Sequence, residues 1–419
     1  MKSTPTLAVI AFPGNNSETE TARAAENNGF KAEIIRWNQV DKIGSYDAYV
    51  LPGGFSFEDR GRAGAIAARE PIFKALREEA SKGKVILGIC NGAQMVVESG
   101  LIPVEQDPLP FALADNVRRD ENDHVMGTGY YNTWCAIKPE RADTAFSSGA
   151  GKVLNVPVAH GEGRFTTRSK TAQLALESGS HVAFRYCNEA GETAQGYPEN
   201  PNGAMSAVAM IVNKEGTVGA IMPHPERYPL ECDGDQIFKA MKLWIEGGQS
   251  PASVQIGDLS AQVAPVVKPF SVNQNAIVLE KTLIITDNEG FSVNQAARDL
   301  LGVDFQLDKS FVYVIEAESL SVDDLVGTGL IANPNKETLV PFTPKPQQLL
   351  VEFFEDDPAL HLADQLTEQL KKKVIVRRLK AWHFEDKITA DQIETVLKNG
   401  LLCNPNSGAL FLAYPDYNA

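Results

Sequence analysis

One cysteine of the chain stands in a pattern that is typical of a nucleophile. Gly88 and Gly92 lie two residues on either side of Cys90, after the apolar run Val85–Ile89 and before a predicted helix over residues 93–98. Glycines at these positions allow a sharp strand-to-helix turn to expose the central side chain without clashes. At a helix N-terminus, free N–H groups and the macrodipole favour the thiolate form. The pattern therefore predicts a reactive thiol, although burial as a structural residue is the usual fate of cysteine.

A base that could activate this thiol follows another predicted strand. His224 and Glu226 come directly after the strand Thr217–Met222, with a proline on each side of the histidine. In an extended backbone the two side chains point the same way, so that the carboxylate can orient the imidazole and stabilise its cation. The prolines stiffen the segment and exclude a helix. Together these residues predict a catalytic triad of Cys90, His224 and Glu226.

Acyl transfer by such a triad also needs hydrogen-bond donors for the oxyanion. Gly53 and Gly54 follow the predicted strand Ala48–Leu51. They would lie at the carboxyl edge of a parallel sheet, where sites form. We expect the backbone N–H groups near Gly54 and at Asn91 to be the donors. A Gly-Gly pair by itself is weak evidence, because such pairs are also common in turns.

A second His-x-Glu motif lies at His160 and Glu162, followed by Arg164. Two such motifs could be the halves of a metal site, since imidazole and carboxylate groups are common metal ligands. That interpretation leaves the Cys90 pattern unexplained, and we therefore expect no metal site. The glycines around His160 favour a flexible loop at the rim of the site or facing a partner. The other histidines have no comparable neighbours: His124, His181, His361 and His383.

The elements that must position these residues are predicted by the pattern of apolar residues. The predicted strands are Leu7–Phe12, Glu33–Ile35, Ala48–Leu51, Val85–Ile89, Leu154–Ala159, His181–Tyr186, Ser206–Val212 and Thr217–Met222, and the predicted helices include Ser17–Asn27, Ala63–Glu79 and Gln236–Ile245. Ser17 and Glu20 are spaced as a capping box. The alternation predicts an α/β fold with a doubly wound, mostly parallel sheet. We place this domain at residues 1–248 and an interdomain linker at residues 249–276, where prolines recur without a clear period.

The remaining part of the chain carries an internal repeat. The sequence from Gly329 to Asn335 recurs 71 residues later, from Gly400 to Asn406. Each copy is embedded in the same predicted order of strand, helix, strand, helix and strand. A coincidence of two turns is the alternative, because Asn-Pro pairs are common in turns. Seven aligned positions and the shared order favour duplication. We therefore predict an α+β domain at residues 277–419, made of two βαβαβ repeats at about 277–343 and 346–419.

Composition excludes several classes of function. The 419 residues carry a formal net charge of −15, so that no excess of Lys and Arg is present to neutralise nucleic-acid phosphates. No apolar run approaches the roughly 20 residues that a membrane-spanning helix needs. Five scattered cysteines and no export signal favour a reducing cytoplasm. A basic cluster, Lys371–Lys373 with Arg377, Arg378 and Lys380, is typical of a solvated face, with an acidic partner or a phosphate as the alternative.

In their order and sequence, four motifs together resemble class I glutamine amidotransferases. They are Pro52–Ser56, Gly88–Gln94, His160–Phe165 and Pro223–Arg227, within about residues 6–247. The resemblance implies a flavodoxin-like fold with Cys90 as the nucleophile and His224 and Glu226 completing the triad. It also implies that Gly53, Gly54 and Asn91 line the oxyanion site and that Gln94 helps to hold glutamine. Residues Gly129–Trp134 depart from the family's pattern. The departure affects the expected contacts with the acceptor-side partner and not the triad.

More narrowly, the motifs are similar to those of the glutaminase subunits of phosphoribosylformylglycinamidine synthases. That resemblance implies hydrolysis of glutamine through a thioester and delivery of ammonia to a separate synthetase of purine biosynthesis, which uses ATP and magnesium. It implies no cofactor in this chain. The repeats resemble the small accessory subunit of the same synthase, best at Leu330–Glu337. The alternatives are another amidotransferase complex, a cysteine hydrolase of similar sheet architecture, and a subunit that mainly serves as a scaffold.

Overall fold

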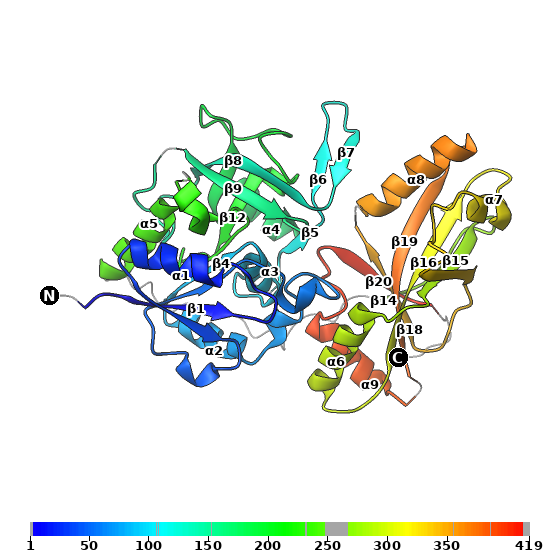
Figure 1. Cartoon of the computed structure of the whole chain (residues 1–419), viewed down its shortest axis with the longest axis horizontal. Helices are drawn as coiled ribbons and strands as arrows, with labels where there is room; N and C mark the ends of the chain where they lie inside the picture. Colours follow the sequence, from blue (N-terminus) through cyan, green and yellow to red (C-terminus); the bar gives the residue numbers. More distant parts are fainter. Residues whose placement is uncertain are drawn as a thin grey trace. The chain divides into compact units, whose positions relative to one another are not determined.

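The computed structural model divides the chain into two compact units, residues 1–262 and 263–419 (Figure 1). It describes residues 3–247 except Gln106, Pro108, Lys152, Glu231 and Cys232, and residues 267–413 except Glu355 and Asp386. The predicted boundary at residue 248 and most of the predicted linker lie outside the described residues. None of the helices in these two ranges is long and apolar enough to cross a membrane.

The first unit is built on one nine-stranded sheet. Its strands, in spatial order, are β2 (Lys31–Arg36), β1 (Thr6–Ala11), β3 (Ala48–Leu51), β4 (Val85–Ile89), β13 (Val218–Ile221), β12 (Val208–Val212), β11 (Val182–Cys187), β8 (Tyr131–Pro139) and β9 (Leu154–His160). The strands from β2 to β13 pair in parallel, and the strands from β13 to β9 pair antiparallel. β1, β3 and β4 are apolar and buried, as expected for central parallel strands. The predicted α/β class is confirmed, and the parallel strands form the half of the sheet that contains β1, β3, β4 and β13.

Helices cover this sheet and connect its strands. They are α1 (Glu18–Asn27), α2 (Ile72–Ser81), α3 (Asn91–Glu98), α4 (Lys170–Glu177) and α5 (Asp235–Glu246). Figure 1 shows α1 and α2 on opposite sides of β1. The predicted helix Ala63–Glu79 is wrong in its first part, because Gly64 has a positive φ of 74° and the regular helix begins only after Pro71. The predicted capping box is also wrong, since the Ser17 side chain donates to Asn16 and does not cap α1.

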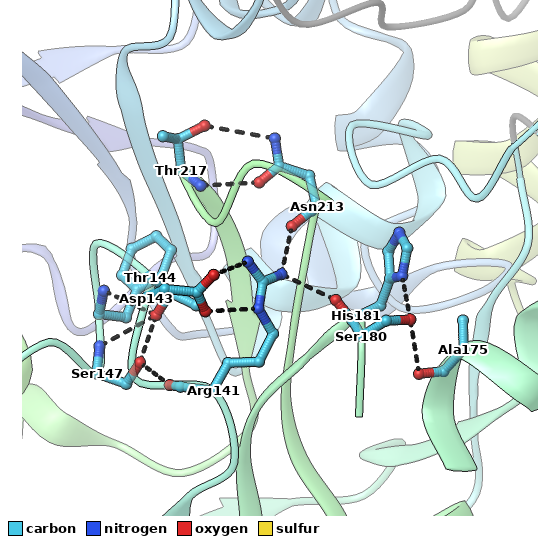
Figure 2. Close-up of polar contacts among 10 residues, drawn as sticks. Arg141, Asp143, Thr144, Ser147, Ala175, Ser180, His181, Asn213 and Thr217 are labelled. Atoms are coloured by element: carbon cyan, nitrogen blue, oxygen red, sulfur yellow. Dashed lines mark hydrogen bonds and ion pairs between the residues drawn. The ribbon is translucent and has the colours of Figure 1, made fainter. Parts of the chain in front are cut away.

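A polar network fastens the end of the sheet that lies away from Cys90 (Figure 2). Arg141, just after β8, donates to the Asp143 carboxylate and to the carbonyl oxygens of Ser180 and Asn213. The Asn213 side chain closes the β12–β13 turn by accepting from the backbone N–H of Thr217 at 2.8 Å. Val218, the next residue, pairs with Ile86 near the start of β4, whereas Cys90 follows the end of β4. The network therefore lies at the opposite end of the strands from Cys90, and we assign it a structural role.

The second unit contains a seven-stranded sheet. Its strands, in spatial order, are β14 (Val267–Pro269), β20 (Gly408–Leu412), β18 (Gln348–Phe353), β19 (Ile375–Phe384), β16 (Leu307–Glu316), β15 (Ile277–Leu283) and β17 (Glu337–Pro341), and its helices are α6 (Asn288–Leu301), α7 (Val322–Gly327), α8 (Asp357–Leu370) and α9 (Ala390–Asn399). Residues 267–269, assigned from the sequence to the linker, form β14, because they pair in parallel with β20. The strand that opens the first predicted repeat is β15.

The two Asn-Pro segments adopt the same turn. The N–H groups of Lys336 and Ser407 donate to the carbonyl oxygens of Asn333 and Asn404, at 2.9 and 3.0 Å. In both turns the asparagine side chain also accepts from the backbone N–H two residues later, at 3.0 and 2.9 Å. Gly329 and Gly400, which precede these turns, both have a positive φ, of 67° and 77°. The hydrogen-bond pattern is therefore repeated at the same spacing as the sequence.

Three of the six residues of the basic cluster pair with carboxylates of this unit. Arg377 makes two hydrogen bonds to Glu352, at 2.7 and 2.8 Å, and Arg378 bonds Asp356 at 2.9 Å. Lys380 bonds Glu289 at 2.7 Å. These three cations are partly neutralised by carboxylates of neighbouring elements, which disfavours the alternative of a phosphate site there.

Candidate active site

Cys90 occupies the sharp turn between β4 and α3. Its φ of 50° and ψ of −107° are unusual for a residue with a side chain, and such strain costs about 1–3 kcal/mol and is concentrated at functional sites. A Cβ atom at Gly92 would lie 1.9 Å from the carbonyl oxygen of Leu51, and one at Gly88 would lie 2.4 Å from that of Gly92. Both glycines are therefore required for the turn, as the sequence pattern predicts.

His224 and Glu226 form a buried pair in the turn after β13. The Nδ1 atom of His224 lies 2.6 Å from Oε1 of Glu226, and both side chains are at most 2% exposed. Burial alone lowers the pKa of an imidazole. The Glu226 carboxylate and the Cys90 sulfur nevertheless outweigh burial and raise the pKa of His224 to about 10. The pair can therefore hold a proton on the imidazole and stabilise its positive charge.

The nucleophile and the base meet at Gly53. A Cβ atom added there would lie 2.9 Å from Cε1 of His224 and 3.5 Å from Cβ of Cys90. β9, at the edge of the sheet, closes the other side: the N–H of His224 donates to Pro157 O at 2.8 Å, and Cys90 Sγ lies 3.7 Å from Ala159 O. The antiparallel half of the sheet therefore curves so that β9 approaches the end of β4. Cys90, His224 and Glu226 lie together at this point.

The predicted oxyanion loop and the start of α3 are joined through one side chain. Oδ1 of the buried Asn91 accepts from the backbone N–H of Ser56 at 2.8 Å, and its Nδ2 donates to Gln94 Oε1 at 2.9 Å. Gly54 has a φ of 145°, and a Cβ atom there would lie 2.5 Å from Cα of Asn15. The glycine pair thus allows the loop after β3 to pass close to two neighbouring backbones, and it places Gly53, Gly54, Asn91 and Gln94 beside Cys90.

The second His-x-Glu motif is arranged differently. His160 is 4% exposed, and its Nδ1 lies 3.1 Å from Oδ1 of Asn116, which also accepts from the N–H of Gly163. Nδ1 of His160 is therefore the protonated nitrogen. Burial and the nearby charge of His224 lower the pKa of His160 to about 3. The Glu162 carboxylate bonds the N–H of Ala63 at 3.3 Å.

This arrangement corrects the expectation of a flexible rim at residues 160–164. The side chains of His160 and Arg164 are buried and hydrogen-bonded. His160 bonds the side chain of Asn116, and Nε of Arg164 donates to the carbonyl oxygen of Asp115 at 2.8 Å. The loop between them is tied to α3, since Gln94 Nε2 donates to the carbonyl oxygen of Glu162 at 2.6 Å. Across the described ranges, no group of three His, Cys, Asp or Glu side chains is arranged to hold a metal ion.

Two residues near the site were missed in the sequence. Asn116 orients His160, and Asp59 accepts from Nδ2 of Asn91 at 3.0 Å. Burial raises the pKa of Asp59 to about 7, against the opposing effect of the Asn91 hydrogen bond. Neither residue lies in a short motif with the triad. Asp59 could have been suspected only because it is a polar residue in the loop after the Gly-Gly pair. Nothing in the sequence around Asn116 indicated that it lies near the site.

Comparison with known proteins identifies the first unit. Residues 4–250 match the family model of the CobB/CobQ-like glutamine amidotransferase domain. The phosphoribosylformylglycinamidine synthase subunit PurQ of Methanothrix thermoacetophila is 39% identical over 262 residues, covering 58% of this chain and 99% of that protein. Its counterpart in Symbiobacterium thermophilum is 37% identical over 248 residues, covering 58% and 97%.

Among solved structures, that of PurLQS from Thermotoga maritima matches 58% of this chain and 100% of the compared chain, with 29% identity and a TM-score of 0.46. The family model covers more than half of the chain and contains every residue of the site described above. The chain therefore belongs to the CobB/CobQ-like glutamine amidotransferases and, within them, to the family of PurQ subunits of phosphoribosylformylglycinamidine synthase.

Proposed function

We propose that this chain hydrolyses glutamine at Cys90 and supplies the ammonia to a separate synthetase that converts formylglycinamide ribonucleotide to its amidine in purine biosynthesis. The observation that carries the proposal is the convergence of Cys90 and the His224–Glu226 pair on Gly53. The relatives named above support the pathway, since they are subunits of that synthase. ATP and magnesium would be used by the synthetase partner, and the chemistry at Cys90 requires no cofactor.

The arrangement accounts for both halves of the hydrolysis. The sulfur of Cys90 attacks the side-chain carbonyl carbon of glutamine, and the proton held by His224 passes to the departing nitrogen, so that ammonia leaves and a thioester forms. His224 then takes a proton from water, whose oxygen attacks the thioester and releases glutamate. Glu226 keeps Nδ1 of the imidazole bonded and stabilises its cation throughout, without itself exchanging protons.

Replacing the nucleophile tests this function. Cys90→Ala should abolish glutamate release, while the complex assembled with the synthetase still forms the amidine from free ammonium. The reason is that Cys90 acts only in producing ammonia. Amidine formation is measured with glutamine and with an ammonium salt as alternative nitrogen donors. Equal loss with both donors would contradict the assignment and point to a structural role for Cys90.

The closed site supports control of this activity by the partner. Cys90 is 6% exposed and His224 2%, and the loop at residues 161–163 is bound to α3 through Gln94. We infer that glutamine enters when these segments move, and such movement is commonly coupled to a partner, which avoids wasteful hydrolysis. The isolated chain should therefore release glutamate slowly and be accelerated by the synthetase. Full activity of the isolated chain would argue against this coupling.

We further propose that the second unit is a duplicated accessory module that binds the synthetase. The repeated Asn-Pro turns, with matching hydrogen bonds, support the duplication. Two tandem units of about 70 residues bury more apolar surface together than either would alone. Covalent linkage would raise the local concentration of the glutaminase at the synthetase surface. Removing residues 251–419 should weaken synthetase binding and its stimulation of glutamate release, whereas a truncated chain that couples normally would exclude the bridging role.

A further inference from the structure

The second unit contains a cavity where two strands of its sheet part. β16 pairs with β19 from Leu307 to Glu316, whereas its pairing with β15 runs from Phe311 to Ile315. The first residues of β16 therefore have β19 on one side and the cavity on the other, and they line it. The cavity has a volume of about 650 Å³. Cavities of this size commonly hold small organic ligands.

Helix α6 closes the cavity with one of its faces. Its lining residues include Asp287, Gly290, Asn294 and Arg298, which are spaced three or four positions apart. Asn294 is 4% exposed, and its Oδ1 has no hydrogen-bond partner among the residues that the structure describes. A buried polar atom that is left unpaired costs free energy. This oxygen therefore indicates that a hydrogen-bond donor is missing from the cavity.

The corresponding helix of the second repeat has an apolar residue at this position. α6 and α8 each have 14 residues and begin after a capping aspartate, Asp287 and Asp356. The seventh residue after the cap is Asn294 in α6 and Ala363 in α8, and Ala363 packs in an apolar core. An alanine is thus sufficient to pack such a helix against this sheet, and the fold by itself does not require the asparagine.

The strand side of the cavity contributes a buried carboxylate. Glu280 is 6% exposed, and its Oε1 accepts from Oγ of Ser310 at 2.6 Å. The ammonium group of Lys345 lies 3.9 Å from the same oxygen, which is too far for a hydrogen bond, and the lysine side chain is exposed. Within the described ranges, no cation therefore bonds Glu280 at hydrogen-bond distance. Burying a carboxylate in this way is costly, and a positive charge from a ligand would offset the cost.

Two further cations that line the cavity are already paired. Lys309 bonds Glu289 at 2.5 Å and Asp287 at 3.1 Å. Arg298 donates from Nε to the carbonyl oxygen of Phe305 at 2.6 Å. The buried groups of the cavity that remain unmatched are therefore both hydrogen-bond acceptors, and a ligand that fits them must bring donors.

Exposed apolar side chains lie beside these acceptors. Leu283 and Phe291 line the cavity and are 38% and 68% exposed. Ile284 and Ile285, which follow Leu283, are 56% and 50% exposed. Neighbouring apolar residues that stay exposed are typical of binding surfaces. The cavity thus combines buried acceptors with an apolar contact surface.

We propose that this cavity binds a small organic cation. Its charged nitrogen pairs with Glu280, an N–H group donates to Oδ1 of Asn294, and an apolar body contacts Leu283 and Phe291. Binding supplies the buried carboxylate with a positive charge and the asparagine oxygen with a donor. The site consists of residues of the second unit alone and does not depend on the proposed glutaminase function.

Tryptamine is a suitable probe, because it has an ammonium group, an indole N–H and a flat apolar ring. Its binding to the full chain is measured by isothermal titration calorimetry at about 0.15 M salt, where nonspecific attraction to the acidic chain is screened. Two compounds serve for comparison: 3-ethylindole lacks the ammonium group, and indole-3-propionate has a carboxylate in its place. We expect saturable binding of tryptamine and at least about 10-fold weaker binding of the other two, the value of a hydrogen bond to a charged group.

Three variants test which residues hold the probe. Glu280→Gln still has an acceptor for Ser310 and should weaken tryptamine binding about 10- to 100-fold. Asn294→Ala, which introduces the residue that α8 has at this position, should weaken it about 2- to 10-fold. Asp299→Asn is the control, because it removes one negative charge from an exposed position of α6 outside the cavity lining. Its affinity for tryptamine should stay within about twofold of the wild type.

The absence of saturable tryptamine binding by the wild type would overturn the proposal. Equal affinity for 3-ethylindole would also overturn it, because an apolar cavity alone would explain that result. A loss of the same size in D299N and E280Q would mean that tryptamine responds only to net charge, which would contradict the site as well. If E280Q does not fold, N294A and the series of three compounds decide the question.

Discussion

The two His-x-Glu motifs have the same spacing in sequence and opposite electrostatics in the structure. His224 lies 2.6 Å from the carboxylate of Glu226, and its pKa is raised to about 10. His160 is bound by the neutral side chain of Asn116, and burial together with the charge of His224 lowers its pKa to about 3. Glu162 contacts the backbone of residue Ala63. One imidazole is thus kept charged and the other neutral, within one site.

The difference shows that a carboxylate two residues after a histidine becomes its partner only if the backbone turns it back. In the turn after β13, Pro225 and Glu226 lie in a tight helical turn, which places the carboxylate against Nδ1. After β9, the chain passes through two glycines, and Glu162 reaches a different loop. Catalytic competence therefore depends on the local conformation that follows the strand and not on the motif alone.

The largest effect is expected from His224. His224→Ala should reduce glutamate release on the order of 10⁴-fold, because members of a triad act as a unit and no other group can hold the proton of the departing nitrogen. His160→Ala, at the corresponding motif position, should lose far less. Both are measured as glutamate released by the complex with the synthetase. Comparable losses in the two variants would mean that His160 shares the role of the base.

Glu226→Gln should have the next largest effect, a loss of glutamate release roughly 10- to 100-fold smaller than that of His224→Ala, since the amide can still contact the imidazole but cannot stabilise its cation. The same change should lower the pKa of His224, which an NMR titration of the imidazole would detect. A pKa raised from about 6.5 to about 10 stabilises the fold below pH 6.5, and that contribution is lost as the pH rises through 10. In E226Q this dependence should weaken. An unchanged titration would refute the pairing.

His160→Gln should change the response of stability to acid. Between pH 6.5 and about 3 the unfolded chain binds a proton at His160 that the folded chain excludes, so the free energy of unfolding falls as the pH falls. Between pH 8 and pH 5 this amounts to about 2 kcal/mol. Urea unfolding of wild type and variant at pH 8 and pH 5 should therefore show about 2 kcal/mol less acid loss in the variant. The same loss in both proteins would mean that His160 is protonated in the folded state.

Glu162→Gln, the counterpart of Glu226→Gln, should have the smallest effect. We expect glutamate release to stay within about threefold of the wild type, because the amide oxygen can still accept from the N–H of Ala63 and the carboxylate has no part in the Cys90–His224 pair. Steady-state rates of the two Glu→Gln variants, measured side by side, provide the comparison. A loss as large as that of E226Q would show that Glu162 acts in catalysis.

Much of the fold followed from periodicity, and its errors have local causes. The α/β class, the central strands and the order of elements in the second unit were predictable, because alternating apolar runs report burial directly. The start of α2 was not, since residues 63–71 have helix-forming composition but are bent at Gly64 and Pro71. β14 was taken for linker because a three-residue strand with a proline carries little pattern, and its pairing with β20 is a contact across the unit.

What the sequence determined about the site is local: the turn that exposes Cys90 needs Gly88 and Gly92, and the prolines around His224 exclude a helix. What the tertiary structure decided is which groups surround each side chain. Asn116 reaches His160 across 44 positions of the chain, and Asp59 reaches Asn91 across 32. The physical reason is that a strand-to-helix turn is set by the sterics of a few adjacent residues, whereas the charge state of a buried group is set by neighbours that only the folded chain brings within hydrogen-bond distance.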